Sequence, residues 1–158
     1  MAVGVHLGVD VGTVRVGVAA CDAEGSLAFP VEVIAQGPTA IPRIVALVRE
    51  RQANGIVVGH PLRLDGTRGP AAEAAEAFAG DLAAAAAPTP VRLYDERLTT
   101  AAAQRSLHGA GLSTKASRRV IDAAAAVQLL DDALTAARAA GIAAMGTVVA
   151  PATVQPGS

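Results

Sequence analysis

Hydrophobic residues alternate with other residues through the first third of the chain. Residues 3–9 have valine or leucine at every second position, and residues 16–19 resume this period after a turn at Gly12. Residues 27–35 form a third such segment, which Pro30 interrupts. A period of two predicts strands with one buried face, and short turns between consecutive strands predict antiparallel pairing. Because proline cannot donate a ladder hydrogen bond, Pro30 favours an edge position for the third strand.

From residue 41 onward the pattern changes to helices that alternate with short apolar runs. Residues 41–52 place their aliphatic side chains on one side of a helix that should end near Gly55. The apolar run 56–58 and the segment 91–94 are typical of buried strands, and an alanine-rich helix over 70–86 separates them. Such strand-helix-strand units predict parallel strands that continue the sheet.

The last part of the chain is predicted to be mainly helical. Thr99 is a suitable N-cap for one helix, and residues 117–140 form the last long one. Beyond it, small residues and prolines predict a loose segment without a core. We therefore expect an α/β domain over residues 1–140, with a mixed five-stranded sheet and helices on both faces. We expect residues 141–158 to be a flexible C-terminal tail.

Composition narrows the classes of function. The chain has 158 residues, which fits one domain, and its formal net charge is −1, so any contact with nucleic acid needs a local basic patch. Aromatic residues make up 2% of the chain, which excludes an aromatic platform for stacking bases. The single cysteine, Cys21, excludes an internal disulfide and a cysteine zinc site. No signal-peptide pattern and no membrane-spanning apolar run are present, so we expect a cytoplasmic protein without membrane contacts.

Asp10 is the first residue with candidate chemistry. It closes the first strand, where a charge at the end of a central apolar strand is costly unless something pairs with it. A metal-ligand role fits this position, with Gly8 and Gly12 allowing a phosphate backbone to approach closely. A structural role, in which Asp10 caps the turn made by Gly12, fits it equally well.

Asp95 and Glu96 close the strand over 91–94. The carboxyl ends of parallel strands are where sites of open α/β sheets lie. Consecutive strand residues point to opposite faces, so only one of the two can face such a site, and the periodicity does not choose between them. The alternative is a surface pair of acidic residues before a helix, where negative charge suits the helix dipole.

Asp122 is the third candidate, and it lies in the last long helix. The positions three, four, seven and eleven residues further on are all apolar, so Asp122 belongs to the stripe that faces the core. A carboxylate in that place needs a partner. The partner is either a metal ion or, one turn earlier in the helix, Arg118 or Arg119.

Three carboxylates from two strand ends and one helix are suited to hard cations such as Mg²⁺. Such hard cations prefer oxygen ligands, and two ions roughly 4 Å apart activate a water and stabilise the leaving oxygen in phosphodiester cleavage. The histidines His6, His60 and His108 share no metal-ligand spacing. We also expect Gly59, after the run 56–58, to leave open the space between Asp10 and Glu96 if its strand lies between theirs.

Four motifs match a known family in order and spacing. They are residues 8–13 (Gly-Val-Asp-Val-Gly-Thr) with 15–19, residues 57–62 (Val-Val-Gly-His-Pro-Leu) with 65–67, residues 95–100 (Asp-Glu-Arg-Leu-Thr-Thr), and residues 121–127 with 129–130. The chain resembles the YqgF family, also called RuvX, whose members are described as pre-16S rRNA nucleases or Holliday junction resolvases. The resemblance covers residues 4 to about 134. His60, where the family usually has an apolar residue, and the lysine-poor segment 112–119 depart from the pattern.

The resemblance implies an RNase H-like fold, a nuclease activity in the maturation of pre-16S rRNA, and the use of Mg²⁺ or Mn²⁺. It also implies that Asp10, Glu96 and Asp122 are both the catalytic residues and the metal ligands, with Glu96 rather than Asp95 facing the site. Structured RNA would then be the partner, with branched DNA as the other possibility, and the protein would be a monomer or a homodimer. The candidate phosphate-binding residues are Arg15, Arg97, Lys115, Arg118 and Arg119.

Three other functions remain open at this point. Resolution of branched DNA by the same site would call for a dimer, because two strands must be cut symmetrically. The turn over 10–13 also resembles a phosphate loop of actin-like ATPases, but 158 residues do not hold the two domains those need. A non-catalytic RNA-binding scaffold is the third, although three clustered carboxylates would repel RNA.

Overall fold

The computed structural model describes residues 3–98 and 115–152, and for positions 115–122 it describes the backbone alone. Its strands form one mixed sheet in the order β3-β2-β1-β4-β5-β6. The strands are β1 (His6–Val11), β2 (Arg15–Cys21), β3 (Ala28–Ala35), β4 (Gly55–His60), β5 (Val91–Asp95) and β6 (Thr147–Val148). β1, β2 and β3 pair antiparallel, whereas β1, β4 and β5 pair parallel. The predicted pairing is confirmed, and β3, which contains Pro30, is an edge strand.

The sheet has six strands rather than the five that we predicted. The additional strand, β6, belongs to the segment expected to be a loose tail, and it pairs antiparallel with β5. Met145, the last residue of the short helix η2 (Ile142–Met145), is fully buried. The tail prediction is therefore wrong for residues 141–152. The two exposed residues of β6 leave no hydrophobic period in the sequence, but their backbone can pair with the open edge of β5.

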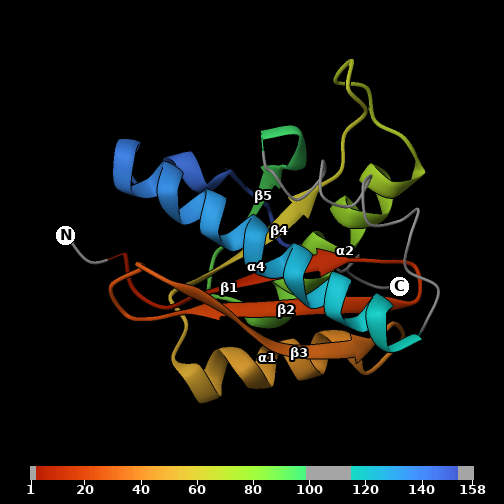
Figure 1. The fold of residues 1–158 in the computed structure, drawn as a ribbon, viewed down its shortest axis with the longest axis horizontal. Coiled ribbons are helices and arrows are strands. Elements are labelled where there is room, and N and C mark those ends of the chain that lie inside the picture. Colours follow the sequence, from red (N-terminus) through yellow and green to blue (C-terminus); the bar gives the residue numbers. More distant parts are fainter. Residues whose placement is uncertain (1–2, 99–114, 153–158) are drawn as a thin grey trace, which may run out of the picture.

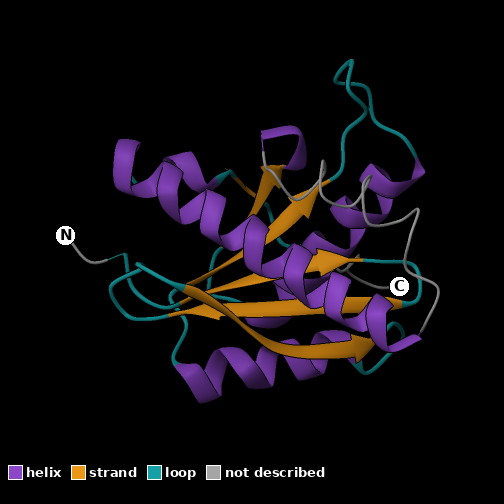
Figure 2. Ribbon diagram, viewed as in Figure 1, coloured by secondary structure: helices purple, strands orange, loops and turns teal. Residues whose placement is uncertain are grey.

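Helices cover both faces of the sheet, as predicted (Figure 1). α1 (Ala40–Arg51) and α2 (Pro70–Ala86) pack on one face, and α4 (Lys115–Ala140) packs on the other (Figure 2). The helix predicted to begin at Thr99 lies outside the described residues. Among the residues that the structure describes, no helix is long and apolar enough to cross a membrane.

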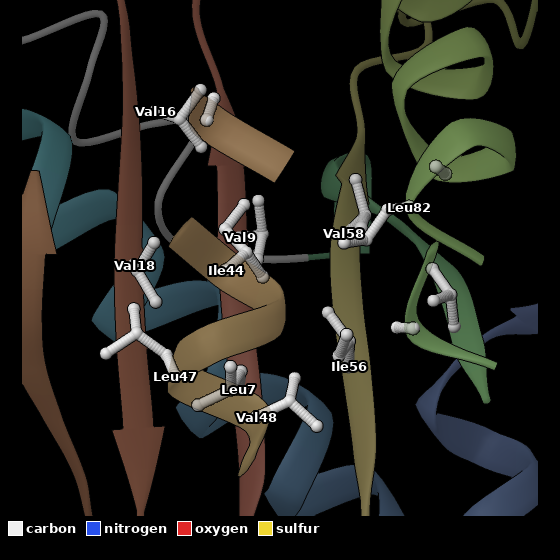
Figure 3. Close-up of a cluster of buried hydrophobic side chains, with 14 of the residues drawn as sticks. Leu7, Val9, Val16, Val18, Ile44, Leu47, Val48, Ile56, Val58 and Leu82 are labelled. Atoms are coloured by element: carbon white, nitrogen blue, oxygen red, sulfur yellow. The ribbon is translucent and has the colours of Figure 1, made fainter. Parts of the chain in front are cut away.

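The alternation along the strands separates two hydrophobic cores. Leu7 and Val9 of β1 and Val58 of β4 are fully buried with Ile44 and Leu47 of α1 (Figure 3). The intervening strand residues point to the opposite face, where α4 supplies the second core. Burying one such aliphatic side chain contributes about 1.5–3 kcal/mol. The period of two that predicts the strands therefore also decides which side chains reach α4.

α4 packs directly against the backbone of β1 at Gly8. A Cβ at this position would lie 2.8 Å from Leu130 Cβ and 3.0 Å from the Ala126 carbonyl oxygen. Further along α4, Arg138 donates a hydrogen bond to the carbonyl of Gly25, in the turn between β2 and β3. Because β2 is antiparallel to β1, that turn lies at the amino end of β1. The first turns of α4 therefore lie at the carboxyl end of β1.

We expect Gly8→Ala to lower the free energy of unfolding by about 1–3 kcal/mol, because the added methyl group must push α4 away from β1. Urea denaturation followed by circular dichroism measures this change. Gly80→Ala in α2 is the matched control, since a Cβ there would lie 3.8 Å from Ala152 Cβ, in ordinary contact. A Gly8→Ala protein as stable as the wild type would contradict this packing.

Candidate active site

Asp10 and Glu96 come from different strands, yet they lie on the same face of the sheet. Val9 belongs to the core under α1, which leaves Asp10 on the face covered by α4. Tyr94 belongs to the core under α4, and Glu96, at the start of the short helix η1 (Glu96–Leu98), lies on that side as well. Asp10 is 9% exposed and Glu96 is 5% exposed. Two carboxylates are therefore buried at the carboxyl edge of the sheet, on its α4 face.

Gly59 lies on β4, the strand between those that carry Asp10 and Glu96. Val9 is level with Val58, so Asp10 is level with Gly59. A Cβ at Gly59 would lie 3.0 Å from Cδ of Glu96 and closer still to Oε1. The space that a side chain would take is thus filled by the Glu96 carboxylate. We expected Gly59 to leave this space open, and the structure shows that the Glu96 carboxylate itself occupies it.

Position 122 lies in α4, and the backbone brings it toward Asp10. The Ala126 carbonyl lies over Gly8. One helical turn before Ala126 is position 122, and two strand residues after Gly8 is Asp10. Both steps advance by about 6 Å toward the same edge. The helix backbone therefore leads to Asp10, while the Asp122 side chain lies outside the described residues.

The donor set at this edge suits a hard divalent cation. Asp10 and Glu96 offer carboxylate oxygens, which are the ligands that Mg²⁺ and Mn²⁺ prefer. Among the described side chains, which do not include that of Asp122, no three histidine, cysteine or acidic groups gather closely enough to hold a metal. The two buried carboxylates are suited to two of the three predicted ligand positions, and the ligand roles of all three residues stay predictions.

Arg15 is the predicted phosphate-binding residue that the sheet places on this face. It begins β2, next to the turn that follows β1, and Val16 and Val18 point into the core under α1. Arg15 therefore points to the α4 side, as Asp10 does. A guanidinium on the face that also carries Asp10 and Glu96 is suited to the phosphate backbone of a substrate.

Arg97 is held by Asp95. Its Nη2 lies 2.6 Å from Oδ2 of Asp95, and its Nη1 donates to the Leu64 carbonyl oxygen at 3.5 Å. The hydrogen bonds from Arg97 lower the pKa of the Asp95 carboxyl. Asp95, which lies on the opposite face of the sheet from Tyr94, is thus paired with Arg97. The phosphate-binding role of Arg97 stays a prediction. The contact with Leu64 is one that sequence reasoning missed.

His60 takes part in a polar cluster with Glu76 and Arg68. Its Nε2 lies 2.7 Å from Oε2 of Glu76 in α2, and Arg68 also binds Glu76. The Arg68 hydrogen bond is the largest cause of the lowered pKa of Glu76. His60, which stands where the family usually has an apolar residue, therefore links β4 to α2. The side chains of Lys115, Arg118 and Arg119, in the first turns of α4, lie outside the described residues.

The strand order, with helices on both faces of a mixed sheet, is that of an RNase H-like fold. Known proteins then identify the family. The model of a family described as "RuvX: Holliday junction resolvase" matches residues 4–136. The chain belongs to the RuvX family.

Proteins from several bacteria are similar in sequence to this chain over most of its length. A Thermobifida fusca protein described as "Putative pre-16S rRNA nuclease" is 50% identical over 145 residues, which cover 87% of this chain and 91% of the relative. A Streptomyces coelicolor protein with the same description is 46% identical over 140 residues, covering 87% and 84%. Such identity over whole domains is consistent with one family.

A solved structure shows the same fold at low sequence identity. T. thermophilus RuvC, in a complex with a Holliday junction substrate, matches this chain with a TM-score of 0.52 at 16% identity. The match covers 87% of this chain and 97% of that chain. It supports the RNase H-like fold, which the sequence analysis predicts.

Proposed function

We propose that this protein is a metal-dependent nuclease that hydrolyses phosphodiester bonds in the maturation of pre-16S rRNA. The observation that carries the proposal is the pair of buried carboxylates, Asp10 and Glu96, on one face at the carboxyl edge, with Gly59 between them. Two carboxylates that are buried on the same face of the sheet are suited to binding a divalent cation. The choice of pre-16S rRNA as the substrate follows the descriptions of two relatives, which are 50% and 46% identical over most of the chain.

Asp10, Glu96 and Asp122 would hold Mg²⁺ or Mn²⁺ in this enzyme. A metal ion bound there would supply an activated water and stabilise the leaving oxygen of the cleaved phosphodiester. The chain's own part is to hold the carboxylates rigidly. β1 fixes Asp10, while β5 with η1 fixes Glu96 against the backbone of β4. Placing ligands on strands and on a packed helix gives the precision that cleavage chemistry needs.

The protein would bind its substrate through the phosphate groups. Arg15 lies on the face of the acidic pair, and Lys115, Arg118 and Arg119 belong to the first turns of α4. With a formal net charge of −1, the whole molecule has no general attraction for RNA, so these cations would act as a local patch. Contacts of this kind position a strand without reading its sequence. Substrate choice would then depend on shape.

Resolution of branched DNA is the second candidate. The description of the family model, and the Holliday junction in the complex of T. thermophilus RuvC, favour it. The same acidic site would serve, because cleavage of DNA and RNA uses the same attack on phosphorus. The difference would be a homodimer, which cuts two strands symmetrically.

The test is cleavage of a labelled precursor rRNA fragment and of a four-way DNA junction, each with Mg²⁺, with Mn²⁺ and with EDTA. We expect metal-dependent cleavage of the RNA, with the DNA junction cut at least tenfold more slowly. Faster cleavage of the junction by a dimer would favour the second candidate. Cleavage that continues in EDTA would reject the metal-dependent mechanism, and no cleavage of either substrate would reject the nuclease.

A further inference from the structure

The segment over residues 61–69, between β4 and α2, stands out from the body of the molecule (Figure 1). We call it the β4–α2 loop. It follows the carboxyl end of β4, directly after Gly59 and His60, so it begins at the edge of the sheet where the acidic pair lies. Leu64 within it is 94% exposed. A single exposed leucine is ordinary on a protein surface, so only the residues around Leu64 can indicate a role for it.

Hydrogen bonds within the β4–α2 loop give it a defined shape. The Arg63 amide donates to the Thr67 carbonyl at 3.0 Å, and the Gly66 amide donates to the Arg63 carbonyl at 2.8 Å. The Asp65 carboxylate accepts from the Thr67 amide at 2.9 Å and from its hydroxyl. Gly66 has a φ of +88°, which closes the turn and favours glycine. Leu64 is therefore presented on a preformed turn.

A hydrogen bond on one side and an ion pair on the other attach the loop to the rest of the domain. Arg97, the residue after Glu96, binds Asp95 and donates to the Leu64 carbonyl oxygen. Near the other end, Arg68 binds Glu76 in α2, with its Nε 2.8 Å from Oε2. The position of Leu64 is thus linked through one side chain to the strand end that carries Glu96. Arg97 is in this sense a positioning residue for the loop.

Charge and hydrophobicity beside Leu64 match the two chemical parts of a nucleotide. Arg63 has no ion pair among the described residues, and its guanidinium lies over the backbone of Gly69, where a Cβ would be 2.9 Å from Nη2. Leu98, two residues after Glu96, is also 68% exposed. A leucine suits the face of a base, and an arginine suits a phosphate.

The aromatic residues of the chain are placed where they cannot replace Leu64. Tyr94 is 6% exposed within the core under α4. Phe29 lies beneath Arg51, and Phe78 packs against the core under α1 and α2. Proteins that bind irregular nucleic acid usually pack bases on aromatic rings. Among the described residues, the exposed aliphatic side chains of Leu64 and Leu98 are groups that suit this contact.

We propose that the β4–α2 loop is a substrate-contacting element, in which Leu64 packs against an unstacked base where paired strands end and Arg63 contacts the neighbouring phosphate. This rests on the proposed nuclease function and adds to it a recognised shape, the junction of paired and unpaired nucleic acid. Apolar side chains act in this way when they wedge against base steps. Because the turn is preformed, little ordering is needed on binding.

The test measures binding separately from cleavage. All proteins carry Asp10→Asn, so that no substrate is cut, and Kd is measured by fluorescence anisotropy. The probes are an RNA hairpin with a single-stranded tail, the same hairpin with blunt ends, and a DNA hairpin with a tail. A fluorescent base analogue at the junction reports directly on packing against the base. Leu64→Ser is compared with Leu27→Ser, which changes a 62% exposed leucine at the opposite edge of the sheet.

We expect Leu64→Ser to raise Kd for the tailed RNA hairpin by about tenfold, or about 1.4 kcal/mol, and to alter the fluorescence of the base analogue. Leu27→Ser should change neither. Equal weakening of tailed and blunt hairpins, a Kd within twofold of the parent, or no binding of any tailed probe would overturn the proposal. A larger rise in Kd for the tailed DNA hairpin than for the tailed RNA hairpin would support the loop contact, with DNA as the substrate.

The outcome does not depend on whether the protein cuts the substrate. If the wild type cleaves nothing but binding depends on Leu64, the nuclease proposal fails and the loop proposal stands. If the wild type cleaves the precursor RNA and Leu64→Ser binds as the parent does, the loop proposal fails alone.

Discussion

Asp10→Asn is expected to abolish metal-dependent cleavage, lowering kcat by about 1,000-fold or more while the protein remains folded. The amide keeps the size of the carboxylate but removes the charge that a divalent cation needs. Cleavage of the precursor rRNA fragment under single-turnover conditions measures the loss, and calorimetric titration with Mn²⁺ should show weaker binding. The far-ultraviolet circular dichroism spectrum should be unchanged.

Glu24→Gln is the matched control for this variant. Glu24 is an exposed carboxylate in the turn between β2 and β3, at the opposite edge of the sheet from Asp10. Neutralising it changes the net charge by the same amount, so a general electrostatic effect on RNA binding would appear in both variants. If the Asp10→Asn protein had full activity, Asp10 would not be a catalytic residue, and the proposed role of the acidic pair would be wrong.

Gly59→Val is the second change with a large expected effect. A Cβ at Gly59 would lie 3.0 Å from Cδ of Glu96, so the larger side chain must displace the carboxylate. Displacing a catalytic group by about 1 Å costs on the order of 100-fold in rate, and we expect at least that loss in kcat. Gly59→Ala should have a smaller effect in the same direction. Rates are measured on the same RNA fragment.

The stability of the Gly59 variants separates a local effect from misfolding. β-branched residues are favoured in strands, so Gly59→Val should retain a cooperative thermal transition. Gly80→Ala, where an added Cβ makes ordinary contact, provides a glycine substitution that should keep full activity. A folded Gly59→Val protein with wild-type activity would show that Glu96 does not need the space over Gly59.

The parts of the fold that depend on local pattern were predictable from the sequence. The period of two along β1 and β2 predicts antiparallel pairing, and the helix over 70–86 is confirmed as α2 (Pro70–Ala86). The same alternation predicts that Asp10 and Val9 point to opposite faces of the sheet. For Glu96 the periodicity left two choices open, and the family resemblance selected the one that the structure shows as buried.

The parts that depend on distant contacts were not predictable in this way. β6 has two residues with exposed side chains, so its pairing with β5 leaves no hydrophobic period. The hydrogen bond from Arg97 to Leu64 joins residues that are 33 positions apart, and the Asp65-Gly66-Thr67 sequence predicts a turn without indicating where the turn will lie. In both cases the backbone of another segment supplies the partner. Side-chain patterning carries no signal for it.

The returning segment over residues 141–152 has a consequence for the solubility of shortened proteins. Removing it would leave β5 as a bare sheet edge, open to pairing with the same edge of another molecule. Gly146 lets the segment approach, because any Cβ there would collide with the backbone of Leu93. At the opposite edge, β3 is protected by Pro30 and by the irregular register beside Val18. A minimal nuclease domain must therefore extend past residue 148 to stay free of edge-to-edge aggregation.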